Sequence, residues 1–302
     1  MFYNKLNGFI VAICLGLALA TPAFAKPIQV VTVTEDFASI TRSVGGDLVR
    51  VNVLIKGSRN LHLIVPKPSM VLSLRHADLI IRLGMNQDGW VDSLIHTAKN
   101  ARLFPGKVGY LDASEGITKL EVPTGKIDGR MGDVHIEGNP HYTLNPQNGI
   151  LIAKEIRDRL SQLDPKNKET YNKNYQQFSR KIQAKMRIWS QQLNEMPDTH
   201  FITYHKVWAY FFDAFSLKGL GEIEALPGIP PTTSHLIKLK QKVSAIKTRK
   251  IVLSTNYYPE HTGKHFAESI KAAYVRVSVN LGEESIDSYE GLFDYLVERI
   301  RR

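Results

Sequence analysis

The sequence has a single cysteine among its 302 residues, and the position of that cysteine limits what its thiol can do. Cys14 lies in the apolar run 9–20, which follows one lysine and ends before the small-residue sequence TPAFA. This arrangement is typical of a secretory signal peptide that is cleaved after Ala25. We therefore expect residues 1–25 to be removed and the exported chain to contain no thiol.

A chain without cysteine cannot contain a structural disulfide, a thiolate metal site or a lipid-modified cysteine at its N-terminus. The apolar run is also shorter than the roughly 20 residues that a membrane-spanning helix needs. We expect a periplasmic protein without a lipid anchor. Residues 26–302 are numerous enough for one large domain or two lobes, and an apolar core must stabilise them.

Little in the sequence indicates a nucleic-acid partner, although the formal net charge is +10. Most basic residues are scattered, apart from one cluster: Lys238, Lys240, Lys242, Lys247, Arg249 and Lys250. No aromatic residue is interleaved with this cluster to stack on bases. We interpret the cluster as the solvated face and exit of a helix.

Short β-branched or apolar runs alternate with segments of helical periodicity along the chain. Eight runs predict strands, at residues 28–33, 49–55, 77–84, 108–113, 201–205, 221–226, 251–255 and 274–279. Helical periodicity between or after them is clearest at residues 88–99, 146–160, 233–246 and 291–301. Alternation of this kind predicts parallel sheets covered by helices.

One segment breaks the alternation and predicts a long helix. Asp164-Pro165 is a typical helix start, and apolar residues then recur at every third or fourth position as far as Leu193. Such a helix would be roughly 45 Å long. We predict an α/β protein with two lobes, each a mainly parallel four-stranded sheet. The lobes would span residues 26–162 and 198–302, joined by a spine helix over residues 163–197, with the binding site in the cleft between them.

The ten histidines differ in their surroundings. Four have ordinary structural or solvent-exposed interpretations: His76, His96, His200 and His235. His261 and His265 have the i, i+4 spacing that could bind a metal as a pair. Their sequence HTGKH lacks the glutamate of a hydrolytic pair, and an exposed helix start is the preferred interpretation.

Three further histidines follow or punctuate predicted strand ends. His62 lies in GSRNLHLIVPKPS, His141 in GNPHYTLNP and His205 at the end of FITYH. Prolines on both sides of His141 restrict its loop. Strand-end loops on one edge of a sheet converge, and here two come from the first lobe and one from the second. The sequence therefore predicts a metal site across the cleft with His62, His141 and His205 as ligands.

These three segments, in this order, resemble the ligand motifs of the periplasmic solute-binding proteins of zinc and manganese ABC transporters, the ZnuA/TroA-like family. The stretches GSRNLHLIVPKPS, GNPHYTLNPQNG and TYHKVWAYFFDAFSL carry the likeness, which covers residues 27–302. The resemblance implies a protein that binds a divalent metal ion and delivers it to a membrane permease, rather than an enzyme. We also expect a monomer.

The chain departs from the family at a fourth ligand. The family usually supplies a carboxylate near residue 255, where this chain has Thr255 followed by Asn256. The acidic contact could be lost, replaced by water, or supplied by one of three other residues: Glu260, Glu224 or His135. The residues alone do not choose among these possibilities.

The set of ligands bears on which metal is transported. Neutral imidazoles suit zinc, copper and nickel, whereas manganese prefers oxygen ligands. Zinc is therefore favoured over manganese. Zinc-specific members often carry a His-rich loop between the first two motifs, but the segment 115–138 contains only His135. We expect no high-capacity metal collection there, and His135 could act as a transient ligand or have a role in the loop.

Three other functions remain open. A zinc hydrolase could use an open fourth coordination position, although no HExxH sequence places a general base. A binder of a metal chelate or an organic solute would need a roomy cleft, which Trp208, Tyr210 and Tyr257 could line. An adhesive surface protein is not excluded by any residue.

Overall fold

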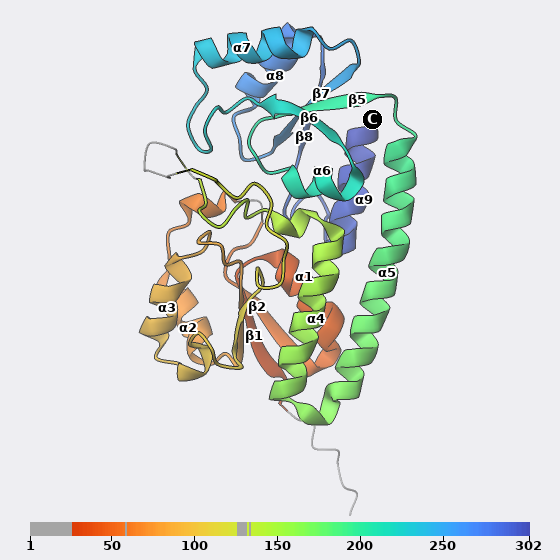
Figure 1. The fold of residues 1–302 in the computed structure, drawn as a ribbon. Helices are drawn as coiled ribbons and strands as arrows, with labels where there is room; N and C mark the ends of the chain where they lie inside the picture. Colours follow the sequence, from red (N-terminus) through yellow and green to blue (C-terminus); the bar gives the residue numbers. More distant parts are fainter. Residues whose placement is uncertain (1–25, 58, 126–131, 133) are drawn as a thin grey trace, which may run out of the picture.

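The computed structural model describes residues 26–57, 59–125, 132 and 134–302, apart from the side chain of His62. The predicted signal peptide, residues 1–25, lies outside the described residues. The described chain forms two α/β lobes, one above the other in Figure 1, with one long helix along their side. The predicted two-lobe α/β architecture is confirmed.

The first lobe is built on a parallel sheet with strand order β2-β1-β3-β4. Its strands are β1 (Ile28–Thr32), β2 (Val49–Val53), β3 (Leu79–Arg82) and β4 (Tyr110–Asp112). All four residues of β3 are buried, as expected for an inner strand covered on both faces. The helices of this lobe are α1 (Glu35–Gly45), α2 (Pro68–Arg75), α3 (Trp90–Ala98) and α4 (Pro146–Leu163). Short 3-10 turns lie between them: η1 (Gly46–Leu48), η2 (Leu61–Leu63), η3 (Ala101–Leu103) and η5 (Tyr142–Leu144).

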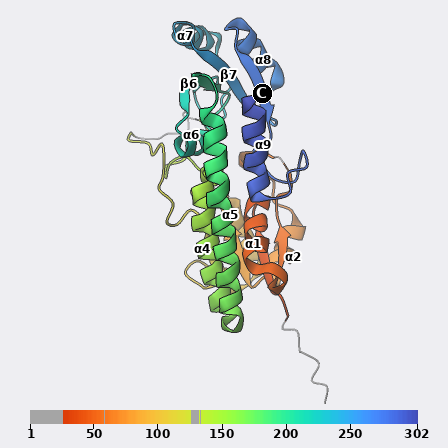
Figure 2. The same cartoon turned by 90° about the vertical axis from the view of Figure 1, so that its right-hand side faces the viewer.

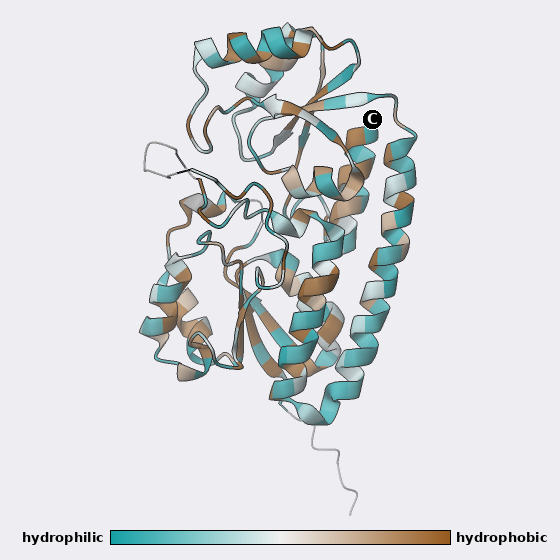
Figure 3. Cartoon of the chain, viewed as in Figure 1, coloured by the Kyte–Doolittle hydropathy of each residue, from teal (hydrophilic) through white to brown (hydrophobic). Residues whose placement is uncertain are grey.

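The second lobe repeats the arrangement with strand order β6-β5-β7-β8, again parallel. Its strands are β5 (Thr199–Thr203), β6 (Lys218–Glu222), β7 (Arg249–Thr255) and β8 (Ala273–Val277). Its helices are α6 (Ala209–Phe215), α7 (Thr233–Ser244), α8 (Glu260–Ser269) and α9 (Tyr289–Arg301). Hydrophobic residues gather on the strands and inner helix faces, and hydrophilic ones on the outer faces of α5 and α7 (Figure 3).

The predicted spine is α5 (Lys168–Asn194), preceded by the 3-10 turn η6 (Pro165–Asn167). At 27 residues it is about 40 Å long. Its buried stripe is Tyr171, Phe178, Ile182, Trp189 and Leu193, all members of the predicted apolar stripe. Figure 2 shows α4, α5 and α9 running alongside one another, so that α5 lies against helices from both ends of the chain.

The last helix, α9, ties the second lobe back to the first. Trp189 donates a hydrogen bond from Nε1 to Asp294 at 2.8 Å, which fixes α9 on α5. The hydroxyl of Tyr289 donates to the carbonyl of Thr143 at 2.7 Å, in the first lobe. One hydrophobic core runs through both lobes. The boundaries at residues 162 and 198 stay a prediction, because this shared core crosses them.

One predicted strand differs in its position. The apolar residues of 221–226 predict a strand there, but β6 is Lys218–Glu222 and starts three residues earlier. It lies at the sheet edge, where backbone pairing with β5 decides its extent, and the register shifts between Phe201 and Ile202. Glu224 consequently lies beyond the strand, in the loop that follows it. In the part of the chain that the structure describes, no helix is both long and apolar enough to cross a membrane.

Candidate metal centre

Two of the three predicted ligands meet between the lobes. The ring centroids of His141 and His205 are 5.9 Å apart, with the ring planes at 89°. His141 directly precedes η5 of the first lobe, and His205 lies two residues beyond β5 of the second. The strand-end loops therefore converge across the cleft at these two residues.

The third predicted ligand, His62, belongs to the turn η2, but its side chain lies outside the described residues. The residues just before it, Arg59, Asn60 and Leu61, line the same small cavity as His141. Its segment of backbone thus reaches the cleft beside His141. Among the described side chains, which do not include the His62 ring, no three His, Cys, Asp or Glu residues are grouped closely enough to hold a metal ion.

His205 is oriented by a carboxylate behind it. Nδ1 of His205 lies 2.7 Å from Oε2 of Glu224, and the two side chains are only 5% and 7% exposed. A carboxylate accepts, so Nδ1 carries the hydrogen, and in the neutral ring the lone pair is on Nε2. The backbone N–H of Gly228 donates to the same oxygen at 3.1 Å. A carboxylate in this position orients metal-binding imidazoles in many proteins.

Tyr258 covers one face of His205. Their ring centroids are 5.4 Å apart with planes at 30°, and Tyr204 stacks on Tyr258 at 4.8 Å. Tyr258 is placed by the turn after β7, in which its N–H donates to the carbonyl of Thr255 at 3.2 Å. The imidazole of His205 is therefore held both by a hydrogen bond at its edge and by a ring on its face.

The position at which the resemblance implies a carboxylate has Thr255 and Asn256 instead. Thr255 is 1% exposed at the end of β7. The side-chain amide of Asn256 donates to Glu283 at 2.8 Å. His141 lines two cavities. In the part of the chain that the structure describes, neither of them is lined by Thr255, Asn256 or Glu260. Glu224, another candidate for the acidic contact, is placed behind His205 with one oxygen engaged there.

Two cavities meet at His141. The inner one has a volume of about 30 Å³, enough for one ion or a water molecule or two, and it is lined by polar residues such as Thr34, Asp36 and Asn280. The outer one has a volume of about 260 Å³ and is lined by His135 and His205 as well as His141. An ion at His141 could therefore have a confined polar side and a roomier side.

The loop that carries His141 is held on both sides. Oδ1 of Asn139 accepts the N–H of His141 at 3.0 Å, while its Nδ2 donates to the carbonyl of Lys206 at 2.6 Å. The hydroxyl of Tyr142 donates to the carbonyl of Leu83 at 2.6 Å. These contacts, in addition to the flanking prolines, restrict the position of the imidazole.

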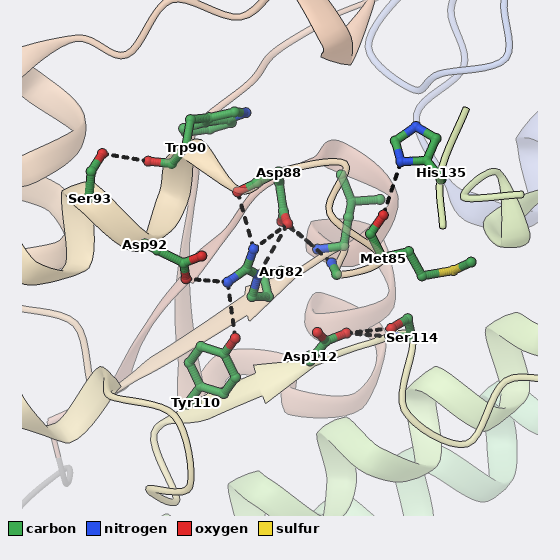
Figure 4. A network of polar contacts seen from close by, with 12 residues as sticks. Arg82, Met85, Asp88, Trp90, Asp92, Ser93, Tyr110, Asp112, Ser114 and His135 are labelled. Carbon is green, nitrogen blue, oxygen red and sulfur yellow. Dashed lines mark hydrogen bonds and ion pairs between the residues drawn. The ribbon is translucent and has the colours of Figure 1, made fainter. Parts of the chain in front are cut away.

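A buried ion pair shapes the loop that receives Tyr142 (Figure 4). Arg82 lies 2.8 Å from Asp88, and the carboxylate of Asp88 also accepts the N–H groups of Leu83 and Gly84 at 2.7 and 3.2 Å. Burial raises the pKa of Asp88, and the charge of Arg82 partly offsets this. The pair therefore supports the backbone on which the His141 loop rests.

The same loop orients His135. Nδ1 of His135 lies 3.0 Å from the carbonyl of Met85 (Figure 4). Since a carbonyl only accepts, Nδ1 carries the hydrogen and the lone pair of the neutral ring is on Nε2. Met85 and Asn86 have φ of 49° and 55°, a left-handed conformation that few residues other than glycine adopt. His135 is placed in the wall of the outer cavity.

The four histidines given ordinary interpretations have structural positions. His76 is the C-cap of α2, and the ring of His96 packs at a tilt against Phe104. His200 contacts the hydroxyl of Thr248, and His235 contacts the carbonyl of Glu222. His261 and His265 lie on α8 and are exposed.

Sequence reasoning missed two residues that shape the site. Tyr258 is one of two tyrosines in STNYYPE, and no local signal marks it as the partner of His205. Asn139 lies within GNPHYTLNP, where an asparagine before a proline is a local signal for a turn. Its link to Lys206 joins residues 67 positions apart, which local patterns do not reveal.

Comparison with known proteins identifies the family of this chain. Residues 30–302 match the family model described as zinc-uptake complex component A periplasmic, ZnuA. The chain belongs to this family. Its members are substrate-binding components of transporters rather than enzymes. The expectation that this chain is not an enzyme is confirmed on that ground.

The relatives have names that refer to several metals. The metal ABC transporter substrate-binding lipoprotein ScbA of Streptococcus cristatus is 26% identical, over 96% of this chain and 93% of its own. The iron-binding protein YfeA of Yersinia pestis is 26% identical, over 92% and 86%. The manganese ABC transporter substrate-binding lipoprotein PsaA of Streptococcus pneumoniae is 26% identical, over 90% and 87%.

A solved structure shares the fold. The crystal structure of ZnuA has a TM-score of 0.74 and 23% identity, and the match covers 91% of this chain and 98% of that one. At this identity the likeness concerns the fold alone. Since several relatives are named lipoproteins, the comparisons give no support to the expectation of a protein without a lipid anchor, which stays a prediction.

Proposed function

We propose that this chain binds a divalent transition-metal ion in the cleft through the imidazoles of His62, His141 and His205, and delivers it to the permease of an ABC transporter. The observation that supports the proposal is the meeting of His141 and His205, 5.9 Å apart, from different lobes. Because Glu224 accepts the hydrogen on Nδ1, the neutral His205 ring has its lone pair on Nε2. An imidazole in this tautomer can bind a metal through Nε2.

Zinc is the proposed cargo, ahead of manganese. Imidazole nitrogens suit zinc, whereas manganese prefers carboxylate and other oxygen ligands. Thr255 and Asn256 replace the carboxylate of the family, and the carboxylate of Glu224 is engaged with His205. This donor set favours zinc, although relatives have names that refer to iron or manganese.

The protein is proposed to act as a monomer on the outer side of the cytoplasmic membrane. Relatives described as periplasmic or as lipoproteins of metal ABC transporters support that location and a membrane permease as partner. The small inner cavity favours a bare ion over an organic solute at His141. The outer cavity of about 260 Å³ has room for a small chelate, so free and chelated zinc need to be compared.

The decisive experiment is a competition titration of chelator-stripped protein with zinc and manganese. We expect tight binding of one zinc ion in the cleft, and a loss of at least 100-fold in affinity for each of His62→Ala, His141→Ala and His205→Ala. His76→Ala, which removes an exposed histidine at the end of α2, is the matched control. A His141→Ala or His205→Ala variant with unchanged affinity would overturn the proposed site. Tighter binding of manganese than of zinc would overturn the proposed cargo.

A further inference from the structure

The helix α8 carries a second pair of imidazoles, outside the cleft. His261 and His265 are one helical turn apart, with ring centroids 6.0 Å apart and ring planes only 9° from parallel. Both residues are exposed. Among the described residues, neither ring forms a hydrogen bond or an ion pair. In Figures 1 and 2, α8 lies at the end of the second lobe that is farther from the first.

The orientation of α8 keeps these rings in solvent. Phe266 and Ala267 face the core, and Gly263 is packed so closely that a Cβ there would lie 2.8 Å from the ring of Tyr274. The helix therefore cannot rotate about its axis without loss of this packing. The two imidazoles are held on the opposite, outward side before any ligand arrives.

This spacing suits a two-point chelate. Zinc–nitrogen bonds are about 2.0–2.1 Å long, so two nitrogens on one tetrahedral ion are about 3.4 Å apart. Residues at i and i+4 on a helix have Cβ atoms only about 5–6 Å apart. Parallel rings 6.0 Å apart thus need only a modest tilt toward each other, through side-chain rotation at an exposed surface.

We propose that His261 and His265 form a second, surface site for a divalent transition-metal ion that favours nitrogen ligands: zinc, copper or nickel. Water would fill the remaining coordination positions. The exposed side chain of Glu268 lies one turn further on the same face, and the exposed Lys264 adds an opposing positive charge. With two nitrogen ligands, the site binds more weakly than the three-histidine cleft. The site does not bind manganese, magnesium or calcium, because these ions prefer oxygen ligands.

The site is tested by zinc stoichiometry in equilibrium dialysis of the full-length mature protein. We expect a second, weaker equivalent of zinc, which persists when His141→Ala and His205→Ala abolish binding in the cleft. Either His261→Ala or His265→Ala should weaken this second equivalent at least ten-fold and leave the first unchanged. The effect of the pair variants on the weaker equivalent is measured whether or not the cleft binds zinc.

Two controls separate the pair from exposed histidines in general. His76→Ala and His96→Ala remove exposed histidines that have no histidine four residues away, and both should retain the second equivalent. Circular dichroism checks that each variant is folded, and titration of the otherwise intact protein avoids reliance on the cleft variants. Absence of a second zinc equivalent, its survival in both pair variants, or equal binding of manganese would overturn the proposal.

Discussion

The side chain of Asn139 joins the two lobes beside the candidate metal centre. Its Nδ2 donates to the carbonyl of Lys206, the residue after His205, at 2.6 Å, while its Oδ1 accepts the N–H of His141. One amide therefore sets the distance between the two loops that carry the histidines. Together with α5 and α9, this contact limits how far the lobes can separate, and we expect only a small closure on metal binding.

Loss of that amide should weaken metal binding. Asn139→Ala removes three hydrogen bonds in a buried position, those with Glu121, His141 and Lys206. Each partner left unsatisfied costs about 1–3 kcal/mol. We expect zinc affinity to fall about ten-fold, measured by competition titration. Asn174→Ala is the matched control, because Asn174 donates a comparable hydrogen bond to Val44 at 3.0 Å, away from the cleft. Equal effects of the two variants on affinity would contradict a specific role for Asn139.

Removal of the carboxylate behind His205 should also weaken the site. In Glu224→Ala the ring loses the acceptor that holds it, and loss of such a partner typically costs about 10- to 100-fold in metal affinity. Glu224→Gln keeps an acceptor oxygen and should lose less. Glu260→Gln serves as the control, since Glu260 lines neither cavity at His141 in the described structure. An effect of Glu260→Gln as large as that of Glu224→Ala would identify Glu260 as the missing carboxylate ligand.

Zinc affinity should fall steeply in acid. An imidazole binds a metal only when it is neutral, and the free side chain titrates at about pH 6.5. As several protons compete with one ion, affinity should drop more than in proportion to proton concentration below about pH 6. Titrations at a series of pH values from 7.5 to 5 measure this slope. A flat profile would mean that imidazoles do not account for the binding.

The stability of the metal-free protein should fall between about pH 4 and pH 7. Asp36 is 4% exposed, and burial raises its pKa from 3.8 to about 7, against opposing hydrogen bonds from Thr143 and Leu281. The folded state therefore holds a proton that the unfolded state releases near pH 4. The contribution of Asp36 to the free energy of unfolding is therefore fully present below about pH 4 and is lost as the pH rises to about 7.

Asp36→Asn should remove most of this dependence and stabilise the protein at pH 8 by a few kcal/mol. Urea denaturation in the presence of a chelator measures it without interference from metal binding. Asp47→Asn, a change at an exposed acid, is the control and should leave the pH profile intact. A profile of Asp36→Asn that is parallel to that of the wild-type protein would rule out Asp36 as the cause.

Much of the fold was accessible from local patterns. The eight predicted strands and the long helix correspond to β1–β8 and α5. Inner strands covered on both faces appear as short apolar or β-branched runs, and a helix buried along one side shows a period of 3.6 residues. The displaced strand β6 shows the limit of this reasoning. Its residues Gly219 and Gly221 have weak strand propensity, and they are extended because β5 is beside them.

The sequence by itself determined the two-lobe α/β class, the spine helix and the loops that bear His141 and His205. Each of these depends on residues that are neighbours along the chain. Only the tertiary structure decided that Glu224 stands behind His205, that Asn139 reaches Lys206, and that Tyr258 covers the imidazole. Such contacts join residues far apart in the chain. Those of Glu224 and Tyr258 with His205 form when the strands of the second lobe pair, whereas the link from Asn139 to Lys206 forms only when packing has brought the lobes together.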